Sequence, residues 1–168
     1  MPRMQITIVC LLASVLSSPL VNARDQAGVQ VFEVTPINST IKFQVKASVE
    51  IKGTFDKWGA TLTFQSPDAT TGVLEITIQA DSVDTGSGMK NGKLKGKDFF
   101  DVEHNPTITF KSTKIVPISS EHFEVDGDLM IRGVSNPEKL TLIVSHKQGH
   151  LGEIHGKMIF DRKKLWHE

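Results

Sequence analysis

Strict alternation of apolar and polar residues constrains this chain more than any other feature of its sequence. From Ile41 to Phe55, every odd-numbered position is apolar or glycine and every even-numbered position is polar. Successive side chains of a strand point to opposite faces, so this stretch would have one apolar face; in a helix the same residues would be scattered around the axis. We therefore predict a β-strand over Ile41–Phe55.

The same alternation recurs along the rest of the chain. Turn-forming residues separate the runs at 57–59, 66–68, 119–120, 135–137 and 148–150. Further strands are predicted at Val29–Val34, Ala60–Phe64, Leu74–Ala80, Ile108–Phe110, Phe123–Gly133, Leu140–Val144 and Ile154–Phe160. About eight antiparallel strands with one apolar face each either stack as a sandwich or close into a barrel. A strand of twelve or more residues would be roughly 40 Å long, about twice the usual length, which favours a tall barrel.

The first 23 residues have the composition of a secretion signal. A positively charged start is followed by an apolar run from Ile6 to Leu16, and Ala23 ends a small-residue cleavage site. The run is short for a membrane span. We therefore expect residues 1–23 to be a signal peptide and residues 24–168 to form one periplasmic or secreted domain. Because Cys10 lies in the signal, the exported domain would contain no disulfide or thiolate metal site.

Charge argues against a nucleic-acid partner for the molecule as a whole, because 19 Lys and Arg balance 19 Asp and Glu. Locally, Lys90, Lys93 and Lys95 lie close before Phe99 and Phe100. One interpretation of this stretch is a solvated loop. The other is a basic, partly apolar flap at the mouth of the barrel, where the lysines form a portal that attracts an anionic head group or a membrane surface.

The sequence Asp84-Thr85-Gly86-Ser87 also occurs in aspartic proteases. In those enzymes two carboxylates share one proton to activate water, which requires a second copy of the motif or a symmetric dimer. The chain has one such motif, and it is followed by Gly88-Met89-Lys90-Asn91 in place of the apolar run that such proteases have. A turn in which Asp84 binds backbone amides is therefore the stronger interpretation. We expect no catalytic residue, and an aspartic-type hydrolase using Asp84 is the enzymatic alternative. The glycine–lysine run that follows does not have the spacing of a phosphate-binding loop.

Three histidines lie near one predicted hairpin, at His146, His150 and His155. Two imidazoles across a hairpin can bind zinc. No cysteine accompanies them, and Glu153 is the nearest carboxylate. We therefore expect solvent-facing histidines, no metal and no cofactor.

The apolar positions predict the lining of the barrel. Small residues are interspersed with large ones at Ala47, Gly53, Ala60, Ala80, Gly127, Gly133 and Gly156. They either leave unfilled volume or mark bulges and points of coiling. A cavity so lined would take an apolar, elongated ligand. The residues predicted to contact it are Phe43, Val45, Leu62, Phe64, Ile76, Ile78, Phe99, Phe100, Phe110, Leu129, Ile131, Leu142, Val144, Met158 and Phe160.

The stretch from Ser82 to Thr113, SVDTGSGMKNGKLKGKDFFDVEHNPTITFKST, resembles the signature of the YceI-like family of lipid- and polyisoprenoid-binding periplasmic proteins. Two flanking stretches also match, GDLMIRGVS at 127–135 and TPINS at 35–39. The resemblance implies a lipocalin-like antiparallel β-barrel of about eight strands, with a short helical or loop flap. It also implies a non-enzymatic protein that holds a polyisoprenoid, an isoprenoid quinone or a fatty acid derivative. A filled β-domain with no ligand is the structural alternative.

The sequence departs from the family pattern at Asn38 and Lys93, each of which replaces a histidine, and at two further places. Lysine replaces arginine at Lys90 and Lys95 and asparagine replaces aspartate at Asn91, so a planar arginine–carboxylate pair would be lost. The chain also ends shortly after 161–166, where relatives add another strand. Without that strand, the barrel would have an open seam unless another segment covers it. An exposed edge would favour a homodimer.

Overall fold

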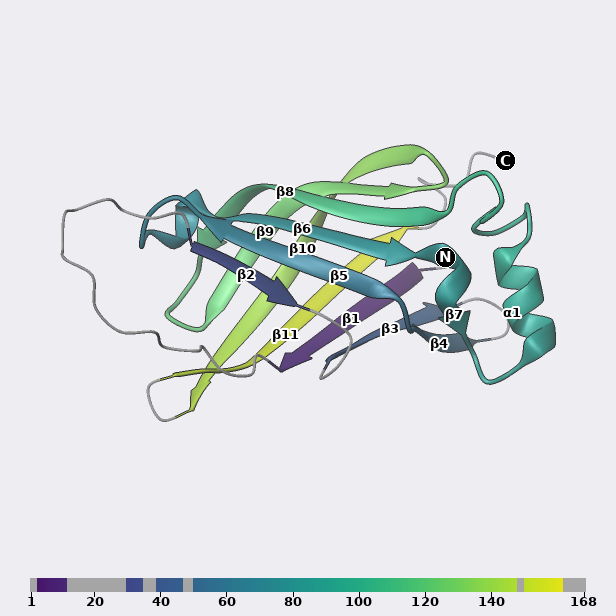
Figure 1. The fold of residues 1–168 in the computed structure, drawn as a ribbon, viewed down its shortest axis with the longest axis horizontal. Coiled ribbons are helices and arrows are strands. Elements are labelled where there is room, and N and C mark those ends of the chain that lie inside the picture. Colours follow the sequence, from purple (N-terminus) through teal and green to yellow (C-terminus); the bar gives the residue numbers. More distant parts are fainter. Residues whose placement is uncertain (1–2, 12–29, 35–38, 47–49, 148–149, 162–168) are drawn as a thin grey trace, which may run out of the picture.

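The structure is a computed structural model that describes residues 3–11, 30–34, 39–46, 50–147 and 150–161. It is one curled antiparallel sheet with a short helix at one end (Figure 1). The strands are β1 Arg3–Leu11, β2 Gln30–Val34, β3 Ser39–Lys46, β4 Ile51–Phe55, β5 Trp58–Phe64, β6 Val73–Gln79, β7 Val83–Asp84, β8 Thr107–Pro117, β9 His122–Ile131, β10 Val134–Lys147 and β11 His150–Asp161. The helix α1 spans Gly88–Lys95, and single 3-10 turns lie at Ala69–Thr71 and Ala80–Ser82.

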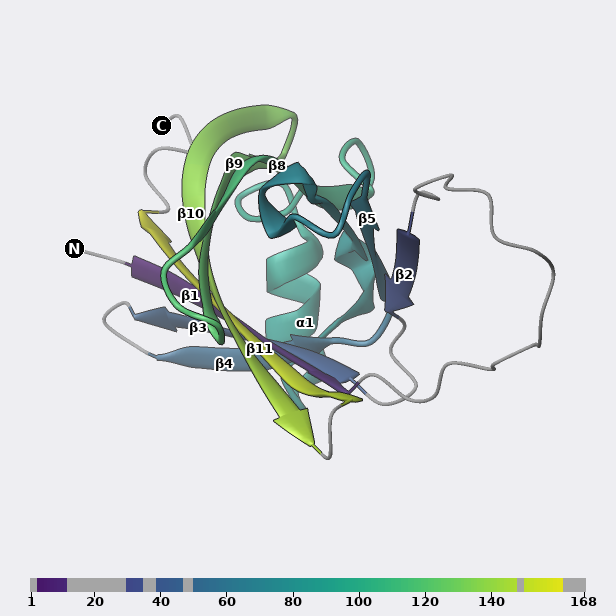
Figure 2. The same ribbon diagram turned by 90° about the vertical axis from the view of Figure 1, so that its left-hand side faces the viewer.

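Strand pairing runs around the whole sheet in the order β2-β5-β6-β8-β9-β10-β11-β1-β3-β4-β7. In three places two consecutive strands act as two parts of one longer ribbon. The strands β2 and β3 pair with β5 and β4, and β5 and β4 pair in turn with β6 and β7. With these pieces joined, the sheet has eight ribbons, and β1 links β11 back to β3. Figure 2 shows them arranged in a curl around the axis on which α1 lies. The predicted antiparallel barrel of about eight strands with a helical flap is confirmed.

The stretch from Ile41 to Phe55 is a hairpin, so the single strand predicted there is wrong. β3 ends at Lys46, β4 begins at Ile51, and the two arms pair with Phe43 opposite Gly53. This register places odd-numbered residues opposite odd-numbered residues, so the alternation continues through the reversal and cannot reveal it. The length argument fails for this stretch, although β10 and β11 are 14 and 12 residues long.

Two predicted turns are also displaced. Residues 135–137 lie inside β10, paired with β9, and the hairpin instead turns at Arg132 and Gly133. Both residues have positive φ, 55° and 72°, as the two-residue turn that matches strand twist requires. The turn predicted at 57–59 lies one residue earlier, at 56–57, so Trp58 is the first residue of β5. The Trp58 side chain is 7% exposed.

Phenylalanine rings fill the space above two of the inward glycines. A β-carbon on Gly53 would lie 2.7 Å from Cε1 of Phe43, and one on Gly127 would lie 2.5 Å from Cζ of Phe110. Gly127 also lies opposite an irregularity of β8 between Ser112 and Lys114, so the expected bulge exists there. These two positions therefore add no empty volume to the interior.

Candidate functional site

The cap that closes one end of the barrel is built from the segment between Asp84 and Phe100 (Figures 1 and 2). Its helix, α1, contains two glycines, and its N-cap Ser87 makes no side-chain capping hydrogen bond. Glycine is a poor helix former, so α1 depends on tertiary packing. Leu94 supplies that anchor with 2% exposure.

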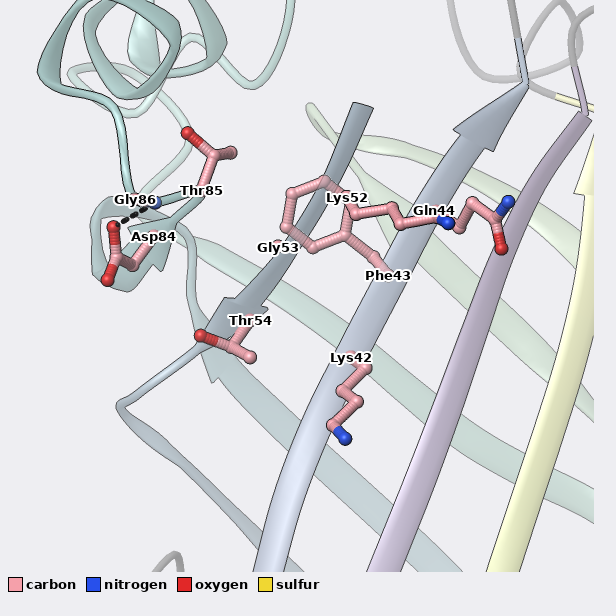
Figure 3. A pocket seen from close by; sticks show the side chains of 9 residues that line it. All are labelled: Lys42, Phe43, Gln44, Lys52, Gly53, Thr54, Asp84, Thr85 and Gly86. Carbon is pink, nitrogen blue, oxygen red and sulfur yellow. Dashed lines mark hydrogen bonds between the residues drawn. The ribbon is translucent and has the colours of Figure 1, made fainter. Parts of the chain in front are cut away.

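The Asp84 carboxylate organises the turn that leads into the cap. Its Oδ1 accepts hydrogen bonds from the backbone N of Gly86 at 2.9 Å (Figure 3) and from Nδ2 of Asn91 at 3.0 Å. Gly86 has a φ of 72°, which glycine adopts without strain. Both hydrogen bonds lower the pKa of Asp84, and the one from Asn91 has the larger effect. A proton-sharing catalytic pair needs one carboxyl whose pKa is raised, so the turn interpretation of this motif is favoured.

Asn91 holds this turn with both ends of its side-chain amide. Besides donating to Asp84, it accepts at Oδ1 from the Thr85 backbone N at 2.8 Å and from Thr85 Oγ1 at 2.7 Å. An ionised aspartate could accept the two hydrogen bonds from Thr85 but could not donate to Asp84. Sequence reasoning treated Asn91 only as a lost charge and missed this role.

Three phenylalanines join the cap to the core. The rings of Phe43 and Phe55 have centroids 5.2 Å apart, and those of Phe55 and Phe100 are 5.8 Å apart in an edge-to-face arrangement. All three are at most 2% exposed. The row therefore runs from β3 through β4 to the residues that follow α1, and it forms the apolar floor of the capped end.

A cleft of about 540 Å³ lies beside this row, on β3, β4 and the Asp84 turn (Figure 3). It is lined by Lys42, Phe43, Gln44, Lys52, Gly53, Thr54, Asp84, Thr85 and Gly86. β7 pairs with β4 only at Thr54 and Phe55, so the edge of β4 beyond Thr54 is not covered by β7. A volume of 300–1,000 Å³ with one apolar wall and a few polar groups is typical of small-molecule sites.

The polar walls of the cleft come from strand positions that sequence reasoning assigned to solvent. The register places Lys42 opposite Thr54 and Gln44 opposite Lys52, on the face away from the Phe43–Gly53 pair. Nζ of Lys52 lies 3.0 Å from Oε2 of Glu50. The alternation does not distinguish these residues from polar residues on the exposed faces of other strands, so it could not identify them as part of a site.

Most of the predicted ligand-contacting residues lie in or against the hydrophobic core. The residues predicted to contact a ligand are all buried or half-buried, with Leu62, Phe64, Phe99, Leu142 and Val144 in the second group. One apolar cavity among them measures about 20 Å³ and is lined by Ile76, Ile78, Ile108, Thr109, Phe110, Leu129, Leu140 and Met158. This is room for about one water-sized group, so a hydrocarbon chain would have to displace side chains.

Among the described residues, the indole nitrogen of Trp58 is buried without a hydrogen-bond partner. Trp58 is 7% exposed, and its indole Nε1 makes no hydrogen bond to any described residue. A buried donor in this condition costs about 1–3 kcal/mol. An oxygen atom brought into the interior could accept its hydrogen bond.

The predicted portal lysines lie on α1. Lys90 and Lys93 are exposed and three positions apart, which places them on neighbouring parts of the helix surface, whereas Lys95 is half-buried. Nζ of Lys93 lies 5.8 Å from the centre of the Phe99 ring, within the range of a cation–π interaction. Met89, beside Lys90, is 88% exposed. The outer surface of the cap thus combines positive charge with an exposed apolar side chain.

The histidines of the predicted hairpin do not assemble a site in the described part of the chain. His155 lies 3.3 Å from Oε2 of Glu153, while the side chains of His146 and His150 lie outside the described residues. No group of three or more metal-binding side chains is found among those that are described. Within the same residues, no helix has both the length and the apolar character needed to cross a membrane.

Comparison with known sequences identifies relatives of most of the chain. The sequence model of the YceI-like domain matches residues 32–165. A UPF0312 protein of Pseudomonas aeruginosa (strain LESB58) is 32% identical over 85 residues, which cover 51% of this chain and 44% of the relative. A UPF0312 protein of Vibrio cholerae serotype O1 is 28% identical over 129 residues, covering 75% and 66%. The chain thus spans about half to two thirds of the length of these relatives.

Comparison with solved structures identifies the same fold. BcnA of Burkholderia cenocepacia superposes with a TM-score of 0.56 at 22% identity, covering 79% of this chain and 96% of that one. A YCEI protein of Campylobacter jejuni superposes with a TM-score of 0.53 at 30% identity, covering 57% and 56%.

Proposed function

This chain belongs to the YceI-like family, and from that membership we propose that it binds a long apolar chain inside its barrel, outside the cytoplasm. The ligand class is a polyisoprenoid, an isoprenoid quinone or a fatty acid derivative. The family and its β-barrel fold support lipid binding in general. The observation that carries the proposal for this chain is Phe43, which belongs both to the cleft wall and to the buried core.

Phe43 provides the route between the cleft and the interior. Its ring lies over Gly53, which has no side chain, and packs against Phe55 behind it. In this proposal, rotation of the ring away from Gly53 opens the cleft to the apolar interior past the edge of β4 that β7 leaves uncovered. A polar head group would then remain beside Lys42 and Lys52 while the tail extends inward.

The energetics of this opening select for long chains. Removing a buried phenylalanine from its site forfeits about 1.5–3 kcal/mol, whereas each methylene buried returns about 0.8 kcal/mol. Roughly four methylenes would therefore offset the displaced ring, and only longer chains would bind with a net gain. A ligand oxygen near Trp58 would add a hydrogen bond to a donor that has no partner among the described residues.

The cap suits transfer of such a ligand from a membrane surface. Met89 is exposed at 88%, beside the exposed Lys90 and Lys93. Anionic head groups attract lysines at about 1 kcal/mol each near the surface. The contact would be transient, because the cap offers one short helix rather than a membrane-spanning element.

Fluorescence of Trp58 tests the proposal directly. In a Trp166→Phe background, energy transfer from Trp58 to a polyene fatty acid should be saturable at one ligand per chain. The affinity should rise with the chain length of saturated competitors. Phe43→Leu should speed uptake, whereas the control Phe123→Leu, at the far end of β9, should not. A filled domain would show no saturable transfer, and a surface site would show no dependence on chain length.

Export is tested separately. If residues 1–23 act as a secretion signal, a chain expressed with its native N-terminus should appear in the periplasmic fraction, cut after Ala23. Recovery of the uncut chain in the cytoplasmic fraction would contradict the expectation.

A further inference from the structure

The strand β1 lies within the residues that the sequence predicts to be a signal peptide. The residues that resemble a secretion signal are also the strand that links β11 to β3. Arg3 to Leu11 pair with Asp161 to Glu153 on one side, and Arg3 to Cys10 pair with Lys46 to Ser39 on the other. Cleavage after Ala23 would therefore remove one of the eight ribbons of the barrel.

The seam that holds β1 is matched to an alternating sequence. The register places Met4 opposite Val45 and Phe160, Ile6 opposite Phe43 and Met158, and Ile8 opposite Ile41 and Gly156. These six partners are all buried. The even-numbered positions of β1 thus belong to the apolar face of the sheet.

The odd-numbered positions of β1 belong to the opposite face of the sheet. Gln5 is opposite Gln44 and Ile159, and Thr7 is opposite Lys42 and Lys157. Lys42, Lys157 and Ile159 are exposed. A shift of one residue would exchange the two faces, so the seam specifies the register as well as the apolar character of its occupant.

We propose that the seam between β3 and β11 is a strand-binding site for an extended segment of about nine residues with an apolar residue at every second position. In this structure the chain's own Arg3–Leu11 fills it. When that segment is absent, β3 and β11 present two unpaired edges, whose N–H and C=O groups can bind an added strand while apolar positions give specificity. The seam shares Lys42, Phe43 and Gln44 of β3 with the cleft, but the proposed strand pairing does not depend on lipid binding.

The test uses the whole folded chain, with a specific protease site placed within residues 12–29 and cut after folding. Native mass spectrometry should show the N-terminal fragment still bound. A synthetic peptide of sequence RMQITIVCL, with Cys10→Ser, should exchange into the seam and displace the fragment. Release of the fragment from a chain that stays folded and monomeric would overturn the proposal, and so would dimerisation of the cut chain through the vacated edges.

Two peptide variants with equal added charge test the face specificity. A peptide with Ile6→Glu and Ile8→Glu should compete at least about ten-fold less well, because position 6 is paired with the buried Phe43 and Met158 and a charge there would face the apolar side of the sheet. A peptide with Gln5→Glu and Thr7→Glu should compete at least as well as the parent, because position 7 lies opposite Lys42 and Lys157. Equal competition by both would indicate non-specific apolar association and would overturn the proposal. Because only the peptide is altered, folding of the protein cannot explain a difference.

Discussion

Gly53→Ala is expected to destabilise the fold by about 1–2 kcal/mol, because a phenylalanine ring and a backbone oxygen occupy the space of the new methyl group. The β-carbon would lie 2.5 Å from the carbonyl oxygen of Asp84 and 2.7 Å from Cε1 of Phe43. Contacts this short force the ring and the β7 backbone to move, and such overpacking costs about 1–3 kcal/mol. The alanine restricts the unfolded chain and returns about 0.4–1 kcal/mol. The expected value is the difference.

Equilibrium unfolding in urea measures this effect against a matched control. Gly92 lies in α1 with no atom within 4 Å of its added β-carbon, so Gly92→Ala should stabilise by about 0.5–1 kcal/mol. In a Phe43→Leu background the cost of Gly53→Ala should shrink, because the shorter side chain leaves only the backbone contact. If Gly53→Ala is as stable as the parent at an unchanged m-value, or behaves like Gly92→Ala, the packing of Phe43 over Gly53 described above is refuted.

Three further perturbations address the cap and the core. Asn91→Ala should raise the pKa of Asp84 toward its usual value of about 3.9, measured by NMR titration of the carboxyl carbon, because the largest cause of its lowering is removed. Since a lowered carboxyl pKa contributes stability that is present above the unfolded pKa and is lost as pH falls through the folded pKa, the variant should lose less stability in acid. Phe55→Ala, at the centre of the aromatic row, should destabilise by about 3–5 kcal/mol in urea unfolding. Lys90→Glu with Lys93→Glu should slow ligand transfer from anionic vesicles several-fold in stopped-flow fluorescence, with the difference vanishing at high salt.

Each of these outcomes has a control or a contrary result. The charge-matched control for α1 changes Lys114 and Lys157, exposed residues of β8 and β11, and should leave transfer rates unchanged. Equal slowing by both pairs would indicate a general charge effect. An Asp84 pKa unaffected by Asn91→Ala would remove the role assigned to that amide. A loss below 1 kcal/mol for Phe55→Ala would show that the row does not hold the cap to the core.

The alternation of the sequence predicts the sheet because burial of one face follows directly from a period of two. It also predicts which face is buried, as Ile76, Ile78 and Leu129 show. It cannot locate a reversal that preserves parity, and the β3–β4 hairpin is such a case, with Phe43 opposite Gly53. Pairing between strands therefore has to come from the structure.

The site was less predictable than the fold. The sequence indicates the cap because Asp84 and the lysines lie in a stretch that interrupts the apolar–polar alternation. The double role of Asn91 depends on a three-dimensional turn that brings its amide to Asp84 and Thr85. The sequence does not reveal that β1 links β11 to β3, because the same residues have the apolar composition of a secretion signal.

Intermolecular NOEs between a bound long-chain ligand and methyl-labelled protein test the central claim most directly. If the chain enters the barrel, its methylene protons should give NOEs to interior methyl groups of Ile78, Leu129 and Met158, which line the small apolar cavity. NOEs confined to the exposed Met89 on α1 would place the ligand on the surface and contradict binding inside the barrel.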